Sequence, residues 1–184
     1  ALYGAAALQV KTIQLPTAPR LLMAPPTLLP TPYQRWMEQD VVYLIAETER
    51  ATFLALTTDD ERDRFIEQFW LRRDPTPATT MNEFKVEHYR RIAYANERFH
   101  TGRPGWQTDR GRVYITYGPP DEIESQPAGA APSEIWRYQW IESIGTNVEL
   151  RFEDPALTGE YGLVRNSRLS RPKAVSQPSL PETA

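Results

Sequence analysis

The chain has 184 residues, of which 40% are hydrophobic and 24% are charged, proportions that are typical of a globular domain and not of a disordered chain or a coiled coil. Its formal net charge of −3 argues against a nucleic-acid-binding protein, because such proteins usually carry a strongly basic domain. The absence of cysteine excludes disulfides, thiolate nucleophiles and cysteine-ligated metal sites, and no apolar run approaches the roughly 18 residues that a membrane-spanning helix needs.

Residues 1–31 are rich in alanine and proline and are expected to form an extended arm or linker. One short strand is predicted within this arm, at residues 10–15. Four leucines make the arm too apolar for a freely solvated linker, so we expect it to dock onto the domain or onto a neighbouring copy of the chain. These leucines are Leu21, Leu22, Leu28 and Leu29.

The first helix is predicted to begin with Thr31 as its N-cap and Pro32 at its first helical position. Apolar residues at helical spacing extend it to about Ile45. A short second helix is expected after Thr48.

Two further helices carry capping-box patterns, in which a hydroxyl side chain is followed three residues later by a glutamate. Thr58 and Glu61 predict the start of a third helix, which is expected to end just before Pro75. A similar pattern at residues 80–83 predicts a fourth helix that runs to Gly102. The first half of the chain is therefore predicted to be helical.

Beyond Gly102 the spacing of apolar residues changes from a helical period to alternation. Residues 112–117 are predicted to form a strand, ended by the glycine and two prolines at 118–120. A loop is expected at 125–132. Alternation then predicts two strands, at 135–140 and 148–153 with a hairpin connection at 145–147.

These elements predict an α+β domain over residues 32–166, in which N-terminal helices precede a small antiparallel β-sheet packed on them. The remaining residues, 167–184, are polar and contain prolines, so a flexible tail is expected.

Residues 105–109 read Gly-Trp-Gln-Thr-Asp. This central sequence and several segments on either side of it resemble one protein family. The flanking segments lie at 67–70, 73–75, 82–84, 87–91, 94–99 and 117–121. Over about residues 33–165 the chain resembles the GWxTD domain family. The resemblance implies no established activity. It does imply a bacterial protein that is exported or attached to a membrane, so an extracytoplasmic location, periplasmic or secreted, is expected by analogy.

The 105–109 loop has two interpretations. In the structural one, Trp106 fills the seam between the helices and the sheet, and Asp109 accepts backbone N–H groups or pairs with Arg110 or Arg112. In the other, the loop and the residues after it bind a ligand or a partner. The candidate binding residues are Trp106, Thr108, Asp109, Arg110, Arg112 and Tyr114.

The end of the third helix and the fourth helix hold two other sets of candidates. Glu83, Glu87 and His88 lie within about one and a half turns, which allows a metal site in principle. Their spacing matches no established motif, and a hydrogen-bonded core histidine is the commoner arrangement, so neither a metal nor another cofactor is expected. Arginines among aromatic residues form either a surface for carboxylate, phosphate or glycan groups or a set of salt bridges. They are Arg72, Arg73, Arg90, Arg91 and Arg98, with Tyr89, Tyr94 and Phe99.

No nucleophile elbow, phosphate-binding glycine loop or zinc-protease motif is present, so no catalytic residue is assigned. The leading hypothesis is a non-catalytic interaction or sensor-associated module. Its partner would be another envelope protein or the rest of a larger membrane-attached protein, and the arm would allow self-association. The alternative is a small-ligand-binding domain or a hydrolase with its site around residues 106–109.

Overall fold

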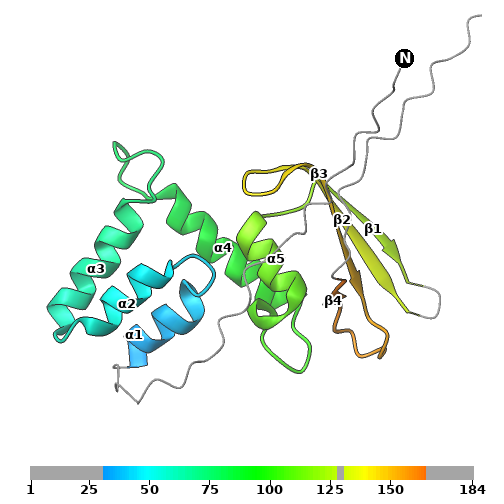
Figure 1. Cartoon of the computed structure of the whole chain (residues 1–184), viewed down its shortest axis with the longest axis horizontal. Coiled ribbons are helices and arrows are strands. Elements are labelled where there is room, and N and C mark those ends of the chain that lie inside the picture. The colour runs from blue at the N-terminus through cyan, green and yellow to red at the C-terminus, as the bar shows by residue number, and fades with distance from the viewer. Residues whose placement is uncertain (1–30, 128–130, 165–184) are drawn as a thin grey trace, which may run out of the picture.

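The computed structural model describes residues 31–127 and 131–164. Helices α1 to α3 lie at one end of the molecule, the sheet lies at the other, and α4 and α5 lie between them (Figure 1). The helices precede an antiparallel sheet, which confirms the α+β class. The predicted arm up to residue 30, with its strand and its leucines, and the predicted tail at 167–184 lie outside the described residues.

The helical elements are α1 (Thr31–Arg35), the π-helix η1 (Trp36–Asp40), α2 (Glu47–Ala55), α3 (Asp59–Leu71), α4 (Glu83–Arg98), the 3-10 helix η2 (Gly105–Gln107) and α5 (Asp109–Tyr117). The strands are β1 (Glu122–Gln126), β2 (Ser133–Ile141), β3 (Gly145–Glu153) and β4 (Gly162–Leu163). Within the described residues they form one sheet in the order β1-β2-β3-β4 with every pair antiparallel.

The helical half is built around an aromatic cluster. The Trp36 ring lies 5.0 Å from Phe53 and 5.2 Å from Phe69, and all three side chains are buried. The predicted capping box of α3 is confirmed, since Thr58 accepts the backbone N–H of Glu61 and the Glu61 carboxylate accepts that of Thr58. Burial of aromatic rings and helix capping thus stabilise this half together.

Two predictions in the helical half were wrong in detail. The first helix does not reach Ile45, because helical structure ends at Asp40. The capping box at residues 80–83 does not form. Instead Asn82 caps α4 by accepting the backbone N–H of Lys85, an equally good cap one residue before the helix.

The sheet packs one face against the helices and leaves the other polar. Its helix-facing side chains are fully or almost fully buried and comprise Trp136, Tyr138, Val148, Leu150 and Phe152. On the opposite face Arg137 forms ion pairs with Glu122, Glu124 and Glu149. Alternation along β2 and β3 therefore predicted the core correctly.

The strand predicted at 112–117 is instead helix α5. Thr108 caps this helix by accepting the N–H of Gly111, and Gly118 ends it with a φ of 86°. Three consecutive residues of α5 are buried, namely Val113, Tyr114 and Ile115. A helix that is covered on several sides has no polar stripe. Its sequence therefore lacks the amphipathic helical pattern from which the other helices were predicted.

The first strand of the sheet was not predicted. Ser125 and Gln126, assigned to a loop, belong to β1, which was missed because it is charged and exposed. The hairpin turn lies at residues 142–144, so residues 145–147 open β3 and do not form the connection.

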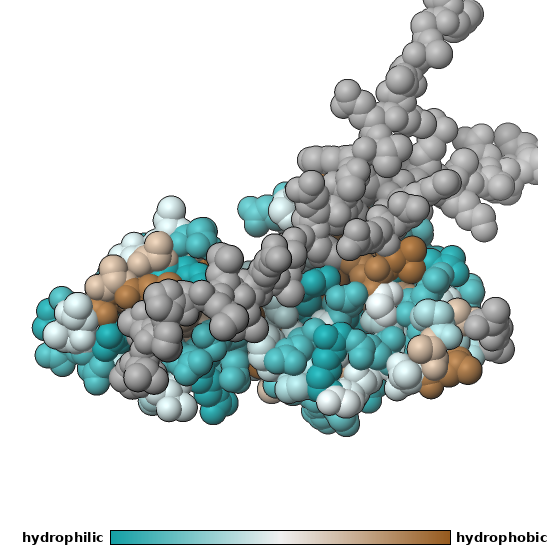
Figure 2. Space-filling model, turned by 60° about the horizontal axis from the view of Figure 1, so that its bottom comes forward, coloured by the Kyte–Doolittle hydropathy of each residue, from teal (hydrophilic) through white to brown (hydrophobic). Residues whose placement is uncertain are grey.

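The surface is mostly hydrophilic, and apolar residues gather in separate patches at the helical end and at the sheet end (Figure 2). Large apolar side chains that are about half exposed or more lie in both halves, at Leu71, Met81 and Val86 and at Ile123, Trp140 and Leu157. Within the described chain, no helix has both the length and the apolar character that crossing a membrane requires.

Candidate functional site

The loop at 105–109 is held by close backbone packing. A Cβ added to Gly105 would lie 1.9 Å from the carbonyl oxygen of Ala95 in α4. A Cβ added to Gly111 would lie 1.9 Å from the carbonyl oxygen of Gly105. Only glycine allows such contacts, so these two positions bring α4, η2 and α5 together backbone against backbone.

Trp106 and Thr108 bind this loop to its surroundings. The backbone N–H of Trp106 donates to Asn96 Oδ1 at 3.0 Å, and the backbone carbonyl of Trp106 accepts from the Tyr43 hydroxyl at 2.9 Å. The Thr108 hydroxyl donates to the carbonyl of Gly105 at 2.7 Å. The Trp106 ring is half-buried beside Tyr43, at the margin of the helix-sheet core. In the structural interpretation Trp106 fills the seam between the helices and the sheet, but the centre of the seam is occupied by Trp136.

Asp109 accepts hydrogen bonds from both kinds of partner that the structural interpretation named, a backbone N–H group and an arginine. Its Oδ2 accepts the backbone N–H of Leu163 in β4 at 2.8 Å, and its Oδ1 accepts from the Arg112 guanidinium at 2.9 Å. The carboxylate thus connects the start of α5 to the last strand of the sheet. Of the six candidate residues, the four that form bonds around this loop are Trp106, Thr108, Asp109 and Arg112.

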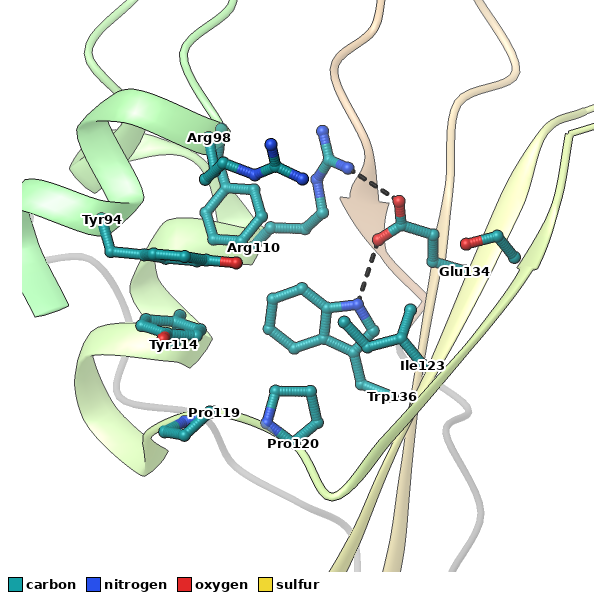
Figure 3. A pocket seen from close by; sticks show the side chains of 11 residues that line it. Tyr94, Arg98, Arg110, Tyr114, Pro119, Pro120, Ile123, Glu134 and Trp136 are labelled. Carbon is teal, nitrogen blue, oxygen red and sulfur yellow. Dashed lines mark hydrogen bonds and ion pairs between the residues drawn. The ribbon is translucent and has the colours of Figure 1, made fainter.

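The other two candidates, Arg110 and Tyr114, line a pocket of about 400 Å³ between α4, α5 and the β1 edge of the sheet (Figure 3). The pocket is lined by Tyr94, Arg98 and Phe99 from α4 and its end, Arg110 and Tyr114 from α5, Pro119 and Pro120 from the connection, Ile123 and Ser125 from β1, and Glu134 and Trp136 from β2.

The walls of the pocket are aromatic and packed against one another. Tyr94 and Tyr114 stack with their rings 4.4 Å apart and 16° from parallel. Phe99 lies 5.9 Å from the Tyr114 ring and 5.6 Å from that of Trp136, which is fully buried at the centre of the seam. Rings held by several neighbours form a rigid surface, so the pocket is preformed.

Arg110 is engaged within the protein. Its guanidinium pairs with Glu134 at 3.0 Å and lies 5.2 Å from the Phe99 ring centre. Glu134 also accepts the indole N–H of Trp136 at 3.0 Å. Both charged side chains are largely buried, with 12% and 18% exposed, so they hold α5 on β2.

Arg98 differs from Arg110. It is exposed and makes no hydrogen bond or ion pair with any residue of the described ranges, although its guanidinium lies at the same end of the pocket as that of Arg110 (Figure 3). Arg98 is therefore a positive charge available to a ligand at the mouth of an aromatic pocket. In the same pocket, burial raises the pKa of the Tyr114 hydroxyl, which stays protonated at neutral pH.

The other four arginines of the predicted Arg-aromatic surface form salt bridges. Arg72 and Arg73 pair with Glu49. Arg90 and Arg91 pair with Glu87, and the hydrogen bonds from these two arginines lower the pKa of Glu87 to about 2.

His88 is a buried core residue. Its Nε2 lies 2.6 Å from the carbonyl oxygen of Asp40, and burial lowers the pKa of its ring. Glu83 binds the hydroxyls of Thr76 and Thr79. Within residues 31–127 and 131–164, no three histidine, aspartate or glutamate side chains are grouped so as to hold a metal ion.

Sequence reasoning found part of this pocket and missed part. The arginines and aromatic residues at 94, 98, 99, 110 and 114 were among the candidates. Trp136 was seen only as a strand residue, Pro119 and Pro120 only as a strand stop, and Glu134 was not singled out. The sequence carried no signal for Glu134 and Trp136, because only the packing of β2 beside α5 brings them to the pocket.

Comparison with known proteins gives one match. The GWxTD domain is found over residues 29–176, which is most of the chain. No curated protein and no solved structure matches it. The matched range contains the glycine-packed loop and every residue of the pocket, and the chain therefore belongs to the GWxTD domain family.

Proposed function

We propose that this chain is a non-catalytic interaction module of the bacterial cell envelope that binds another protein through the pocket between α4, α5 and β1. The observation that carries the proposal is a preformed aromatic pocket with Arg98, which pairs with no described residue, at its mouth. The envelope location is supported by the family resemblance alone.

The pocket suits an apolar side chain next to an acidic group. Aromatic rings and prolines offer apolar surface, whose burial contributes about 25 cal/mol per Å². Arg98 is able to donate two parallel hydrogen bonds to a carboxylate, the geometry that guanidinium groups favour. The predicted partner group is therefore an aromatic or aliphatic residue that carries, or adjoins, a carboxylate.

The side chains of the pocket do not form a catalytic group. A nucleophile needs a hydroxyl or thiol paired with a base. Among the described residues, no hydrogen bond joins the Tyr94, Tyr114 or Ser125 hydroxyl to a histidine or a carboxylate. Glu134 is already bound to Arg110 and to the Trp136 indole. These contacts support binding without chemistry.

A second candidate is binding of a free small molecule, the alternative reading of this region. The volume of about 400 Å³ favours it, because small-molecule sites typically span about 300–1,000 Å³. In that case the ligand would be a planar or apolar acid.

Binding is tested with N-acetylphenylalanine and its neutral amide, followed by two-dimensional NMR of the full chain. We expect the indole N–H signal of Trp136 to shift, and the acid to bind about two- to five-fold more tightly than the amide, the range of an exposed ion pair. Arg98→Gln should abolish that difference. Arg64→Gln, an exposed arginine on α3, is the matched control and should preserve it.

The outcomes separate the two candidates. Weak, millimolar binding of the free amino acid with much tighter binding of a peptide that ends in it supports a protein partner. Equal affinity for both supports a small ligand. No shift at Trp136 at millimolar concentration would refute the pocket as the binding site.

The location has its own test. Antibody detection of the native protein in fractionated cells of its source bacterium should place it in the periplasm, the outer membrane fraction or the medium. Recovery in the cytoplasm would refute this part of the proposal.

A further inference from the structure

Strand β1 is an edge of the sheet. Among the described residues it pairs only with β2, so one of its two sides carries backbone groups without a partner strand. Pro119 and Pro120 precede the strand and Pro127 follows it. Since proline cannot donate a backbone hydrogen bond, any strand that pairs with this edge is limited to about the five residues of β1.

The pocket is open along this edge. Ile123 pairs with Trp136 and Ser125 pairs with Glu134 in the register of β1 and β2, and all four line the pocket. Ile123 is 50% exposed. Although β1 is short and carries charged side chains on its outer face, as protected edges often do, its inner face presents an exposed isoleucine beside a cavity.

We infer that the partner is an extended segment that adds to β1 as a fifth strand of the sheet and places an apolar side chain in the pocket. The inference rests on the proposed function, because it uses the same pocket. In strand addition, backbone hydrogen bonds supply affinity and pockets for alternate side chains supply specificity. The free edge and the adjacent pocket meet both requirements.

The charges beside β1 define the partner further. On the outer face Glu122, Glu124 and Glu149 surround Arg137, three carboxylates around one guanidinium. The side chains of an added strand alternate between the two faces. The predicted segment therefore alternates apolar residues, which face the pocket, with basic residues, which face Glu122 and Glu124 of the adjacent β1.

The same charges disfavour a second copy of this chain as the occupant. If two β1 strands paired antiparallel over their full length, Glu124 of each copy would lie opposite Glu124 of the other. Like charges directly opposite one another destabilise a strand pair. A basic segment from another protein is the better complement.

The test uses the full chain and the peptide acetyl-Lys-Val-Lys-Phe with a free carboxyl end, which extends N-acetylphenylalanine by the predicted alternation. We expect at least ten-fold tighter binding than that of N-acetylphenylalanine, with slower hydrogen exchange of the amides of β1. Replacing both lysines by glutamates should weaken binding at least five-fold.

Backbone methylation provides the sharpest control. Two peptides are compared, one N-methylated at the valine and one at the second lysine, because the amides of adjacent residues in an added strand face opposite sides and only one of the two faces β1. At least one should bind ten-fold more weakly than the parent, although its side chains are unchanged.

The failure of strand addition is distinguishable from failure of the pocket. If both methylated peptides bind as well as the parent while the Trp136 signal still shifts, the segment does not pair with β1, and the proposed function stands. If nothing shifts the Trp136 signal, both proposals are wrong.

Other occupants would give other results. Dimerisation in light scattering that the neutral substitution Glu124→Gln strengthens would identify a second copy. Peptide binding that is detectable only in a Leu21→Ser, Leu22→Ser variant would identify the chain's own N-terminal segment. Either result would overturn the inference of a foreign partner.

Discussion

The loop at 105–109 and the pocket beside it are neighbours on α5, yet they use their side chains differently. In the loop, Thr108 and Asp109 bond to backbone groups of the same domain. In the pocket, Arg98 and Ile123 face outward, with Arg98 bonded to no described residue and Ile123 half exposed. The residues of the distinctive 105–109 sequence thus stabilise the fold, and side chains without a partner among the described residues indicate the candidate site.

The difference has a chemical reason. A residue that satisfies buried backbone groups has few substitutes, because the replacement leaves a donor or acceptor unpaired. A residue at the mouth of a pocket contributes little to folding and is free to serve a ligand. The two regions should therefore respond oppositely to mutation.

The largest expected effect is that of Gly105→Ala. The added Cβ would lie 1.9 Å from the Ala95 carbonyl oxygen, so α4 and η2 would have to separate, at a cost of about 3 kcal/mol or more. Urea unfolding should show the loss. Gly102→Ala is the control, because its Cβ meets nothing within 4 Å and only its φ of 24° is strained, which costs about 1 kcal/mol. Equal losses in both variants would contradict the close-packing account.

Trp106→Ala should have the next largest effect. The ring is half-buried against Tyr43 and the core margin, so its loss should cost about 2–3 kcal/mol, below the 3–5 typical of a fully buried tryptophan. Guanidinium-chloride midpoints measure it. The affinity of the folded protein for N-acetylphenylalanine should not change, and a loss of affinity without loss of stability would make Trp106 part of the binding site.

Lowering the pH should reduce the free energy of unfolding without changing the structure of the pocket. Burial lowers the pKa of His88 below its ordinary value of 6.5, so the unfolded chain binds a proton first as the pH falls. The stability is complete above about pH 6.5 and declines towards the folded-state pKa, by up to about 1.4 kcal/mol per pH unit. Unfolding free energies at pH 7 and 5.5 measure the decline, and His88→Gln should flatten it. A slope that His88→Gln leaves unchanged would assign the effect to other groups.

Whether an element was predicted correctly from the sequence depended on which of its faces are buried by other elements. The core of β2 and β3 was predicted, because one face of the sheet is buried and the other is polar, which imposes alternation. Helix α5 was taken for a strand, because α4 and the sheet cover it and its buried residues are consecutive. Strand β1 was missed, because an exposed edge has no apolar pattern to detect.

The site was predicted in part for a related reason. Arginines and aromatic residues of α4 and α5 were recognisable as candidates from their chemistry. Which of them meet is decided by the packing of α4, α5 and the sheet, to which the close contacts of Gly105 and Gly111 and the ion pair between Arg110 and Glu134 contribute. The sequence alone therefore could not show that Arg98 pairs with no described residue while Arg110 is bound to Glu134.

The most direct test is a paired measurement of stability and affinity on Asp109→Asn and Arg98→Gln. Asp109 accepts bonds from Leu163 and Arg112, so its substitution should cost about 1–2 kcal/mol of unfolding free energy. It should leave the affinity of the folded protein for N-acetylphenylalanine unchanged. Arg98→Gln should leave the unfolding free energy within about 0.5 kcal/mol of the parent and remove the preference for the acid over its amide. If Asp109→Asn instead abolished binding at unchanged stability, the loop and not the pocket would be the functional site.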